Sequence, residues 1–374
     1  MQDPPQSSPP RALARIDLDA LRHNYDRLEA RADGARVVTV IKADGYGQGL
    51  RRVAAALERA EILAVATLAE ARCLRDNGER RRLLLLQGFI DAAELGAFQA
   101  LELEPVIHSR EQIEILERQP NARWPRLWLK LDTGMHRLGF DTADCDSAYR
   151  RLKALPEVGE IILMSHLANA DRPGKPGVAG QIEAFDHAAG GMAGAVSLAN
   201  SAATWSLPDS RRDYVRPGLM LYGVSPFADT CGLDLGLRPV MSLYSRLIAV
   251  QERQAGDAVG YGWRYTCPRD MRLGVVAIGY GDGYPWHARN GTPVLVNGRR
   301  AALAGAVSMD MLTIDLSEVE GAKVGDRVLL WGDGLPVEEV AAGAGTIPWA
   351  LLCGVTARVE FRYTDAVGSA TGAS

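Results

Sequence analysis

A lysine, Lys42, directly follows an apolar run at residues 37–41 and precedes a glycine-rich segment at residues 44–49. The apolar run is rich in β-branched residues and predicts a buried strand, which places Lys42 where the strand ends. Partial desolvation there would lower the pKa of the amine and make it a nucleophile and a proton-transfer base. The glycines leave room for a ligand close to the backbone. The pattern predicts an anionic cofactor bound to Lys42, although a lysine in such a turn is more often a solvated strand cap.

Further polar residues stand at or shortly after the ends of other predicted strands. These residues are Arg137, His166, Asn200, Ser201 and Arg216. Barrel enzymes carry their active sites at the C-terminal ends of the strands, so we expect these side chains to meet Lys42. Ser201 and the turn at residues 216–219 offer a hydroxyl and free backbone N–H groups, which are typical of a phosphate site. Each residue alone also fits a structural role, as a core histidine, a helix N-cap or a rim salt bridge.

Eight short apolar runs alternate with amphipathic helical stretches in the first two thirds of the chain. The runs lie at residues 37–42, 62–67, 83–86, 103–108, 127–131, 161–166, 195–198 and 214–216. Eight strand–helix units in about 200 residues predict an α/β fold with an N-terminal (β/α)8 barrel of the TIM type. Helical periodicity becomes scarce near Arg238, and the remaining segments predict short strands joined by turns at Asn297-Gly298 and Asp333-Gly334.

We therefore expect three segments. A disordered tail covers residues 1–11, a cofactor-binding barrel that opens with the strand ARIDL covers residues 12–240, and a mostly β C-terminal domain covers residues 241–374. The alternative is a single larger α/β domain.

Composition excludes several classes of protein. The chain has 374 residues, of which 47% are hydrophobic and 24% charged, and this balance is ordinary for a globular enzyme. A net charge of −4 argues against a nucleic-acid partner. The glycine segment lacks the Gly-Lys-Ser/Thr ending of a P-loop and the spaced glycines of a dinucleotide fingerprint.

The sequence shows no pattern typical of a targeting segment or of a metal site. The Pro-rich N-terminus carries no apolar core, so we expect neither a secretory signal nor a membrane anchor, and no window is apolar enough to span a bilayer. Five widely spaced cysteines and six dispersed histidines favour free thiols in a reducing cytoplasm over a disulfide framework or a metal site.

From Ala14 to Tyr363 the sequence resembles the alanine racemase family, pyridoxal-phosphate-dependent isomerases that join a barrel to a β domain. The motifs that carry the resemblance are VIKADGYGQG, KLDTGMHRLG, SHLANAD, NSAA, VRPGLMLYG, VGYGWRYT, GYGDGYP, GAVSMDM and RVEFRY. The resemblance implies interconversion of L- and D-alanine in the bacterial cytoplasm, which supplies D-alanine for peptidoglycan.

The resemblance also implies how pyridoxal 5'-phosphate is held. Lys42 would carry the cofactor covalently, and Arg216 would hold its pyridine nitrogen. An arginine cannot accept a proton, so it would leave that nitrogen unprotonated and the carbanion short-lived, which suits racemisation better than transamination. The residues implied around the phosphate are Tyr46, Asn200, Ser201, Gly218, Leu219 and Tyr363.

Proton transfer would use two bases on opposite faces of the external aldimine. Lys42 is one base, and Tyr261 is implied as the other, delivered from the partner subunit of a homodimer with shared active sites. His166 and Arg137 would lie beside the cofactor. The residues implied for substrate binding are Arg137, Tyr284, Met309 and Asp310. With Tyr261 and Tyr363, Tyr284 is expected to crowd the entrance and favour small substrates.

Three positions concern variation within the family. Gln48 stands where histidine is commoner, and Ser308 stands where a cysteine is often found. Lys130 is a candidate for carbamylation, which would turn a cation into an anion able to hold Arg137. An unmodified lysine remains the alternative at this position.

Three rival functions remain open. A broad-specificity amino-acid racemase would act on serine or basic substrates, and such relatives tend to be exported. A decarboxylase of the same architecture would place an acidic residue, instead of Arg216, at the ring nitrogen. A non-catalytic pyridoxal-phosphate carrier would consist of a lone barrel, so the β domain with Tyr261 counts against it.

Overall fold

The structure is a computed structural model that describes residues 10–119, 122–172 and 177–365. It divides into two compact units. We call Arg22–Leu221 with Ser225–Thr230 the barrel unit, and the described residues of Met1–Leu21, Tyr222–Val224 and Cys231–Ser374 the β unit. Each unit is described by itself below.

The barrel unit is built on a closed parallel sheet. Eight parallel strands of the described chain follow one another around it, and the last pairs back with the first. In spatial order they are β2 (Arg36–Val40), β3 (Ile62–Val65), β4 (Arg82–Leu85), β5 (Leu103–Ile107), β6 (Trp124–Asp132), β8 (Val158–Met164), β9 (Val196–Ser197) and β10 (Tyr214–Val215). The two-residue strand β7 (Phe140–Asp141) pairs with the end of β6. These strands coincide with the eight apolar runs, which confirms the predicted barrel.

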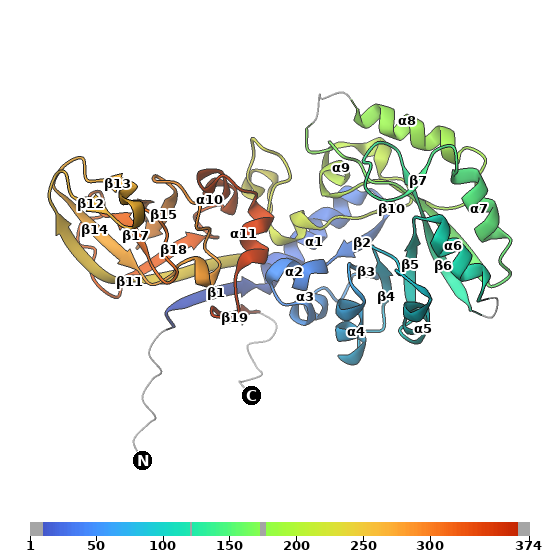
Figure 1. The fold of residues 1–374 in the computed structure, drawn as a ribbon, viewed down its shortest axis with the longest axis horizontal. Coiled ribbons are helices and arrows are strands. Elements are labelled where there is room, and N and C mark those ends of the chain that lie inside the picture. The colour runs from blue at the N-terminus through green and yellow to red at the C-terminus, as the bar shows by residue number, and fades with distance from the viewer. Residues whose placement is uncertain (1–9, 120–121, 173–176, 366–374) are drawn as a thin grey trace, which may run out of the picture. The chain divides into compact units, whose positions relative to one another are not determined.

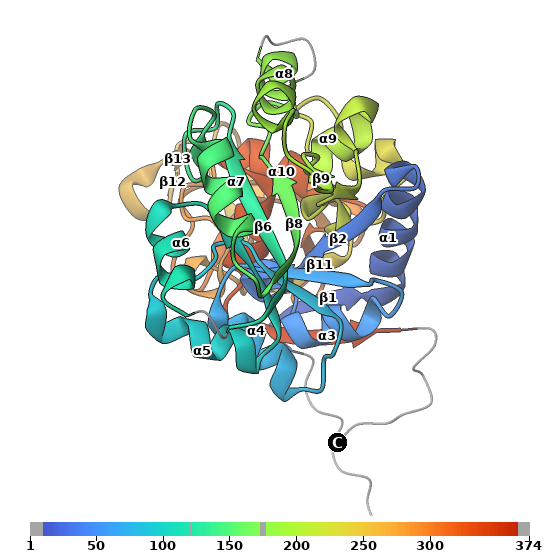
Figure 2. The ribbon, with the colours of Figure 1, turned by 90° about the vertical axis from the view of Figure 1, so that its right-hand side faces the viewer.

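Helices surround these strands, as Figure 2 shows for α3 to α8. Their bounds are α1 (Leu18–Ala32), α3 (Leu50–Ala56), α4 (Leu68–Asp76), α5 (Ala92–Ala100), α6 (Arg110–Glu117), α7 (Cys145–Lys153), α8 (Val178–Ala189) and α9 (Ser201–Ser206), with the short 3-10 helix η1 (Pro208–Ser210) after α9. Several begin at side-chain caps, such as Thr67 for α4, Asp91 for α5 and Ser109 for α6. The caps satisfy N–H groups that the first helical turn leaves unpaired.

A polar cluster lies within the barrel wall. Glu104 on β5 is only 7% exposed, and its carboxylate accepts hydrogen bonds from Arg82 Nε (2.6 Å) and Trp128 Nε1 (2.8 Å). The Trp128 ring in turn packs edge-on against Tyr214, with ring centroids 5.2 Å apart. Glu104 thereby links three neighbouring strands, β4, β5 and β6, by charge-assisted bonds.

The β unit contains a closed antiparallel sheet (Figure 1). Within the described residues its strands run in the order β14 (Met271–Val276), β17 (Leu312–Asp315), β16 (Arg299–Leu303), β15 (Pro293–Val296), β18 (Arg327–Trp331) and β11 (Met241–Arg253), and β11 pairs back with β14. Outside this ring, β1 (Ala12–Asp17) pairs antiparallel with the first half of β11, and β19 (Glu360–Thr364) runs parallel to β1.

Shorter elements complete the β unit. They are the hairpin β12 (Ala258–Val259) and β13 (Tyr265–Thr266), the helices α10 (Val337–Ala344) and α11 (Pro348–Gly354), and the 3-10 turns η3 (Gly232–Leu235), η4 (Tyr261–Trp263) and η5 (Tyr280–Asp282). The 3-10 helix η2 (Leu219–Tyr222) stands where the chain passes from one unit to the other. The mostly β character of the C-terminal part is as predicted.

The N-terminal strand differs from the prediction. β1 was expected to open the barrel domain, but it belongs to the sheet of the β unit. Its burial alternates, with Ala12, Ala14 and Ile16 buried and the residues between them partly exposed, whereas β3 is buried throughout. The expected boundary at residues 240 and 241 also shifts, because Cys231 onward lies in the β unit. Of the expected tail, residues 1–9 lie outside the described residues, and Arg11 donates a hydrogen bond to the Ala277 carbonyl (3.0 Å).

The described part of the chain lacks membrane-spanning helices, metal-binding clusters and disulfide bonds. No described helix is both long and apolar enough to cross a membrane. No group of three or more His, Cys, Asp or Glu side chains in the described ranges could hold a metal ion. No disulfide bond joins the cysteines of these ranges.

Replacing Glu104 with alanine should destabilise the barrel unit. The change leaves the half-buried Arg82 guanidinium and the Trp128 N–H without their acceptor, so the free energy of unfolding should fall by about 3–5 kcal/mol. Urea titration measures this loss. Glu117→Ala is the matched control, because its ion pair with Arg151 (2.8 Å) lies at the surface and its loss should cost less than about 1 kcal/mol. Equal losses in the two variants would contradict the structural role of Glu104.

Candidate active site

The segment after Lys42 is a left-handed turn. Figure 1 labels it α2 (Lys42–Gly47), but four successive residues, Ala43 to Tyr46, have φ between 52° and 64° and ψ between 42° and 53°. This conformation costs an L-residue about 1–2 kcal/mol. Gly45 is required within the turn, because a Cβ atom there would lie 2.9 Å from Val53 Cγ2. Surrounding contacts must therefore hold the turn in place.

Backbone hydrogen bonds fix both ends of this turn. The Gly45 N–H donates to the Ile41 carbonyl (2.9 Å), which ties the turn to the segment that ends β2. The Gly49 N–H donates to the Asp44 carbonyl (2.9 Å), and the Asp44 carboxylate accepts the Leu50 N–H (2.7 Å) at the start of α3. The turn thus sets the direction in which the chain leaves Lys42.

Two hydroxyl groups meet the backbone at Gly218. The Gly218 N–H donates to Ser201 Oγ (2.9 Å), and a Cβ atom at Gly218 would lie 2.6 Å from Tyr46 Oη. Leu219 continues the chain from there into η2. Tyr46, Ser201 and Gly218 come from three separate segments, and the structure brings them together. Hydroxyl and N–H donors around a glycine form a cradle suited to phosphate oxygens.

Asn200 supports this cradle as a cap. Its side-chain oxygen accepts the Ala203 N–H (3.1 Å) at the start of α9, and its amide nitrogen donates to the Leu167 carbonyl (3.1 Å). Both polar ends of the Asn200 side chain are engaged in these bonds. The structure therefore gives Asn200 the N-cap role and fixes the start of α9, on which Ser201 stands.

Arg216 is a buried cation at the end of β10. Only 5% of it is exposed, and its guanidinium donates to Ser197 Oγ (2.5 Å) and to the carbonyls of Ser165 (2.6 Å) and Leu198 (3.4 Å). Burial lowers the pKa of Arg216 to about 10, so it stays protonated at neutral pH. Hydrogen bonds to the ends of β8 and β9 hold this charge in a fixed position.

Several polar residues of the barrel lie close enough to influence one another electrostatically. Burial, followed by the charges of Arg216, Lys130, Arg137 and Lys42, lowers the pKa of His166 to about 3. His166 is therefore neutral in the folded protein. Burial, followed by the charges of Arg216 and Arg137, lowers the pKa of Lys130 to about 8. Since cations gather here at the strand ends, the region should attract an anionic ligand.

Arg137 stands on a loop built around a carboxylate. Asp132 Oδ1 accepts the N–H groups of Gly134 (2.9 Å), Met135 (3.0 Å) and His136 (3.0 Å). Three N–H groups on one oxygen fold the chain sharply just before Arg137. The loop thus brings an exposed arginine back toward the barrel end.

The remaining predicted site residues belong to the β unit. Tyr261 is 76% exposed on η4, and the neighbouring residues Gly260, Gly262 and Trp263 have positive φ. Met309 is 52% exposed, and its carbonyl accepts the Gly281 N–H (2.9 Å). Both residues are placed by contacts within the β unit.

Asp310 and Tyr363 also lie in the β unit. The Asp310 carboxylate accepts a hydrogen bond from Arg358 Nη2 (2.6 Å). This bond ties the loop that contains Asp310 to the segment that contains Arg358. Tyr363 is half-buried on β19, next to Ile16 of β1. Their predicted contacts with substrate and cofactor stay predictions.

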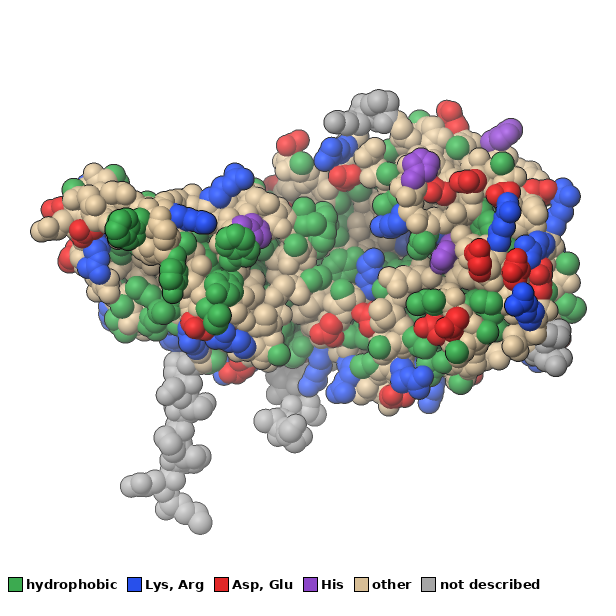
Figure 3. Space-filling view, in the orientation of Figure 1, with side chains coloured by type: hydrophobic (Ala, Val, Ile, Leu, Met, Phe, Trp, Pro, Cys, Tyr) green, Lys and Arg blue, Asp and Glu red, His purple; other side chains and the backbone are tan. Residues whose placement is uncertain are grey.

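Large hydrophobic side chains are exposed on the β unit, and Figure 3 shows several of them gathered on one face of it. They include Tyr261, Trp263, Tyr280, Trp286, Met309 and Met311. Exposed aromatic and methionine side chains in such number are typical of surfaces that bind another protein.

The expected role of Tyr284 at the site entrance is wrong. Tyr284 is only 1% exposed and stacks on Trp331, with ring centroids 6.1 Å apart and an interplanar angle of 18°. Burial raises the pKa of its phenol. The chain turns at η5 and at Gly283, whose φ is 101°, so that Tyr280 is 44% exposed while Tyr284 enters the core. The entrance therefore loses one of its three expected aromatic rings.

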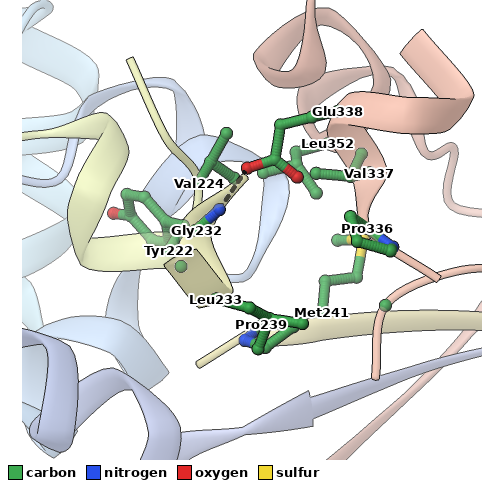
Figure 4. Close-up of a pocket in the computed structure, with 12 residues that line it drawn as sticks. Tyr222, Val224, Gly232, Leu233, Pro239, Met241, Pro336, Val337, Glu338 and Leu352 are labelled. Atoms are coloured by element: carbon green, nitrogen blue, oxygen red, sulfur yellow. Dashed lines mark hydrogen bonds between the residues drawn. The ribbon is translucent and has the colours of Figure 1, made fainter. Parts of the chain in front are cut away.

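A small cavity of about 10 Å³ in the β unit is not part of the candidate site. Figure 4 shows Tyr222, Val224 and Met241 on its wall, with the Glu338 carboxylate accepting the Gly232 N–H (2.9 Å). None of its lining residues is a candidate site residue. Its volume is about that of one water molecule, so it is too small for a substrate or a cofactor.

Sequence reasoning missed residues that support the site. Ser165 and Ser197 hold Arg216, and Glu70 contacts the left-handed turn. The spacing of Thr67 and Glu70 matches a helix capping box and could have drawn attention to Glu70. No local pattern indicates that the same carboxylate also reaches the segment after Lys42.

Two family models match this chain. The alanine racemase N-terminal domain matches residues 16–226, and the alanine racemase C-terminal domain matches residues 240–363. An alanine racemase from Thioalkalivibrio sulfidiphilus is 50% identical over 355 residues, which cover 94% of this chain and 98% of that protein.

Solved structures similar to this chain are also alanine racemases. A crystal structure of biosynthetic alanine racemase from Pseudomonas aeruginosa is similar with a TM-score of 0.92 and 45% identity, covering 96% of this chain and 100% of that one. Alanine racemase from Bartonella henselae with covalently bound pyridoxal phosphate is similar with a TM-score of 0.87 and 30% identity, covering 95% and 100%. Together with the barrel, the β unit and the cluster at the strand ends, these matches show that the chain belongs to the alanine racemase family.

Proposed function

We propose that this protein interconverts L- and D-alanine with pyridoxal 5'-phosphate as its cofactor. The observation that carries the proposal is the end of the barrel, where Lys42 shares one cluster with the buried Arg216 and the neutral His166. When bound, the cofactor withdraws electrons from the α-carbon of an amino acid and makes its proton acidic. The protein must then hold the cofactor and move protons at that carbon.

The barrel residues fit the cofactor. Lys42 would hold it covalently, and Tyr46, Ser201 and Gly218 would bind its phosphate through two hydroxyls and a backbone segment. Arg216 would hold the pyridine nitrogen and leave it without a proton, since a guanidinium only donates. Leu219 and Asn200 would support the phosphate cradle, and Tyr363 would add a further hydroxyl.

Two residues would move protons at the α-carbon. Lys42, released from the cofactor when substrate binds, would serve one face, and Tyr261 would serve the other. Arg137 and the Met309 backbone would receive the substrate carboxylate, with Asp310 fixing the loop that carries Met309. His166 would hydrogen bond within the site without carrying charge, because its pKa is about 3.

We further propose that two copies of the chain form a homodimer with shared active sites. Tyr261 is 76% exposed, and several other large hydrophobic side chains of the β unit are exposed as well. A surface of this kind suits a partner protomer, which would receive Tyr261 at its own barrel.

The cysteines of the described residues form no disulfide, which is consistent with a reducing cytoplasm.

Racemisation of a panel of L-amino acids by the purified protein with added cofactor tests the substrate. L-alanine should react fastest, and the product would then supply D-alanine for peptidoglycan in a bacterium. Comparable initial rates on L-serine, L-lysine or L-arginine would favour the broad-specificity racemase. Absorbance of bound cofactor without any racemisation would favour the carrier protein.

We also propose that Lys130 reacts with carbon dioxide to form a carbamate. Its pKa of about 8 leaves about a tenth of the amine neutral at pH 7, and only the neutral amine adds to carbon dioxide. The carbamate would exchange a buried cation for an anion near Arg137 and reduce the repulsion among the cations of the site.

Lys42→Ala should lower the rate of L-alanine racemisation by about 10³-fold or more, because the covalent anchor and one base disappear together. Polarimetry with saturating cofactor measures the rate. Lys153→Ala, at an exposed position near the end of α7, is the control and should keep full activity. Substantial activity in Lys42→Ala would reject the proposed role of Lys42.

Mixing two inactive variants should restore activity if the sites are shared. Lys42→Ala and Tyr261→Phe, mixed in equal amounts and allowed to exchange subunits, would form heterodimers with one complete site each. About a quarter of the wild-type activity should return. The control replaces Tyr261→Phe by the double variant Lys42→Ala/Tyr261→Phe, which can form no complete site. Failure to recover activity, with exchange verified by mass spectrometry, would reject the shared site.

With isotope-labelled bicarbonate, the protein should give a carbamate carbon signal by NMR that Lys130→Met lacks. The signal should grow as pH rises through about 8, because deprotonation of Lys130 supplies the reactive amine. Racemisation by Lys130→Met shows whether the carbamate matters for the reaction. A signal that persists in Lys130→Met would assign the carbamate to another amine.

A further inference from the structure

We propose that Glu70 is a positioning residue for Lys42, because its carboxylate holds the left-handed turn that directly follows the lysine. The inference rests on the proposed role of Lys42. Glu70 belongs to the first turn of α4, on a different strand–helix unit from Lys42. The link between the two units passes through the backbone of Asp44.

The turn needs an external partner. Ala43, Asp44 and Tyr46 have φ values of 55°, 53° and 52°, which L-residues avoid because the Cβ atom crowds the carbonyl oxygen. Ala43 and Asp44 are exposed, so packing of their side chains does little to hold them. Hydrogen bonds to the backbone must then keep the turn left-handed.

Glu70 supplies such a bond to the middle of the turn. Its Oε1 accepts the Asp44 N–H (3.1 Å), while its Oε2 accepts the N–H groups of Ala66 (3.0 Å) and Thr67 (3.1 Å). One carboxylate therefore ties the turn after β2 to the segment between β3 and α4. Asp44 is two residues from Lys42, so a shift of the turn moves the lysine backbone directly.

The two oxygens of Glu70 do different work. Oε2 serves the helix cap, and the cap has a second, independent bond in which Thr67 Oγ accepts the Glu70 N–H (3.2 Å). Oε1 serves the turn. A glutamine side chain would keep only one accepting oxygen, and its NH2 group would face N–H donors. It could therefore accept hydrogen bonds from the turn or from the helix cap, but not from both.

Loss of the Asp44 bond should let the turn relax toward negative φ and displace the Lys42 amine. A displacement of about 1 Å in a reacting group can cost up to about a hundredfold in rate. The cost should fall on turnover, because Lys42 moves a proton in the reaction, and much less on the KM for alanine.

The experiment compares Glu70→Ala and Glu70→Gln with Thr67→Ala in the full-length protein. Thr67→Ala is the matched control, since it weakens the same helix cap but leaves the bond from Glu70 to Asp44 intact. The first measurement is amide hydrogen exchange of a peptide covering residues 41–50 in protein without cofactor. Exchange there should be faster in both Glu70 variants and unchanged in Thr67→Ala.

Two further measurements follow Lys42 itself. The rate at which cofactor-free protein gains visible absorbance on addition of pyridoxal phosphate should fall in the Glu70 variants. The kcat for L-alanine should fall about tenfold in Glu70→Ala and by less in Glu70→Gln, with KM within about twofold of the wild-type value. Thr67→Ala should match the wild type in both measurements.

Unchanged exchange of residues 41–50 in both Glu70 variants would overturn the proposal, as would equal effects in Glu70→Ala and Thr67→Ala. If Glu70→Ala fails to fold, Glu70→Gln against Thr67→Ala decides by the same measurements. If even the wild-type protein does not racemise alanine, the proposed function fails, while hydrogen exchange and cofactor uptake still decide whether Glu70 positions Lys42.

Discussion

The charge of Arg216 is the constraint on which the site depends. An arginine cannot shed its proton at physiological pH, so a guanidinium that is only 5% exposed needs acceptors around it. Ser197 and the carbonyls of Ser165 and Leu198 provide them at the ends of two neighbouring strands. A side chain held this firmly acts on its neighbours as a fixed positive charge. It adds to the burial that lowers the pKa of both His166 and Lys130.

The barrel supplies the rigidity that such a site requires. β3 and most of β2 are buried. Directly after β2 the backbone is left-handed from Ala43 to Tyr46, a conformation that is energetically unfavourable for L-residues. The strained turn is held in place from two directions. The pairing of β2 with β3 fixes the strand before the turn, and the Glu70 carboxylate accepts a hydrogen bond from within the turn. A strained turn at a strand end can thereby present a lysine in one orientation instead of many.

Different parts of the fold were predictable for different physical reasons. Buried parallel strands appear as continuous apolar runs, so the eight barrel strands were predictable from these runs and from the amphipathic helical stretches between them. β1 was assigned to the wrong unit because its partner strand, β11, begins more than 200 residues later in the chain. Two tyrosines lie four residues apart in GYGDGYP, and only the backbone around Gly283 decides that Tyr280 faces solvent and Tyr284 the core.

The pKa values within the barrel unit support the proposal that a second base comes from outside it. A group that carries a proton in each turnover works best with a pKa near the operating pH. His166, at about 3, holds no proton on its second nitrogen at neutral pH and is a poor carrier. Lys130, at about 8, has a suitable value only while it remains an amine, and a carbamate would remove it from the reaction. In the proposed reaction Lys42 serves one face of the α-carbon, and the exposed phenol of Tyr261 is the residue proposed for the other face.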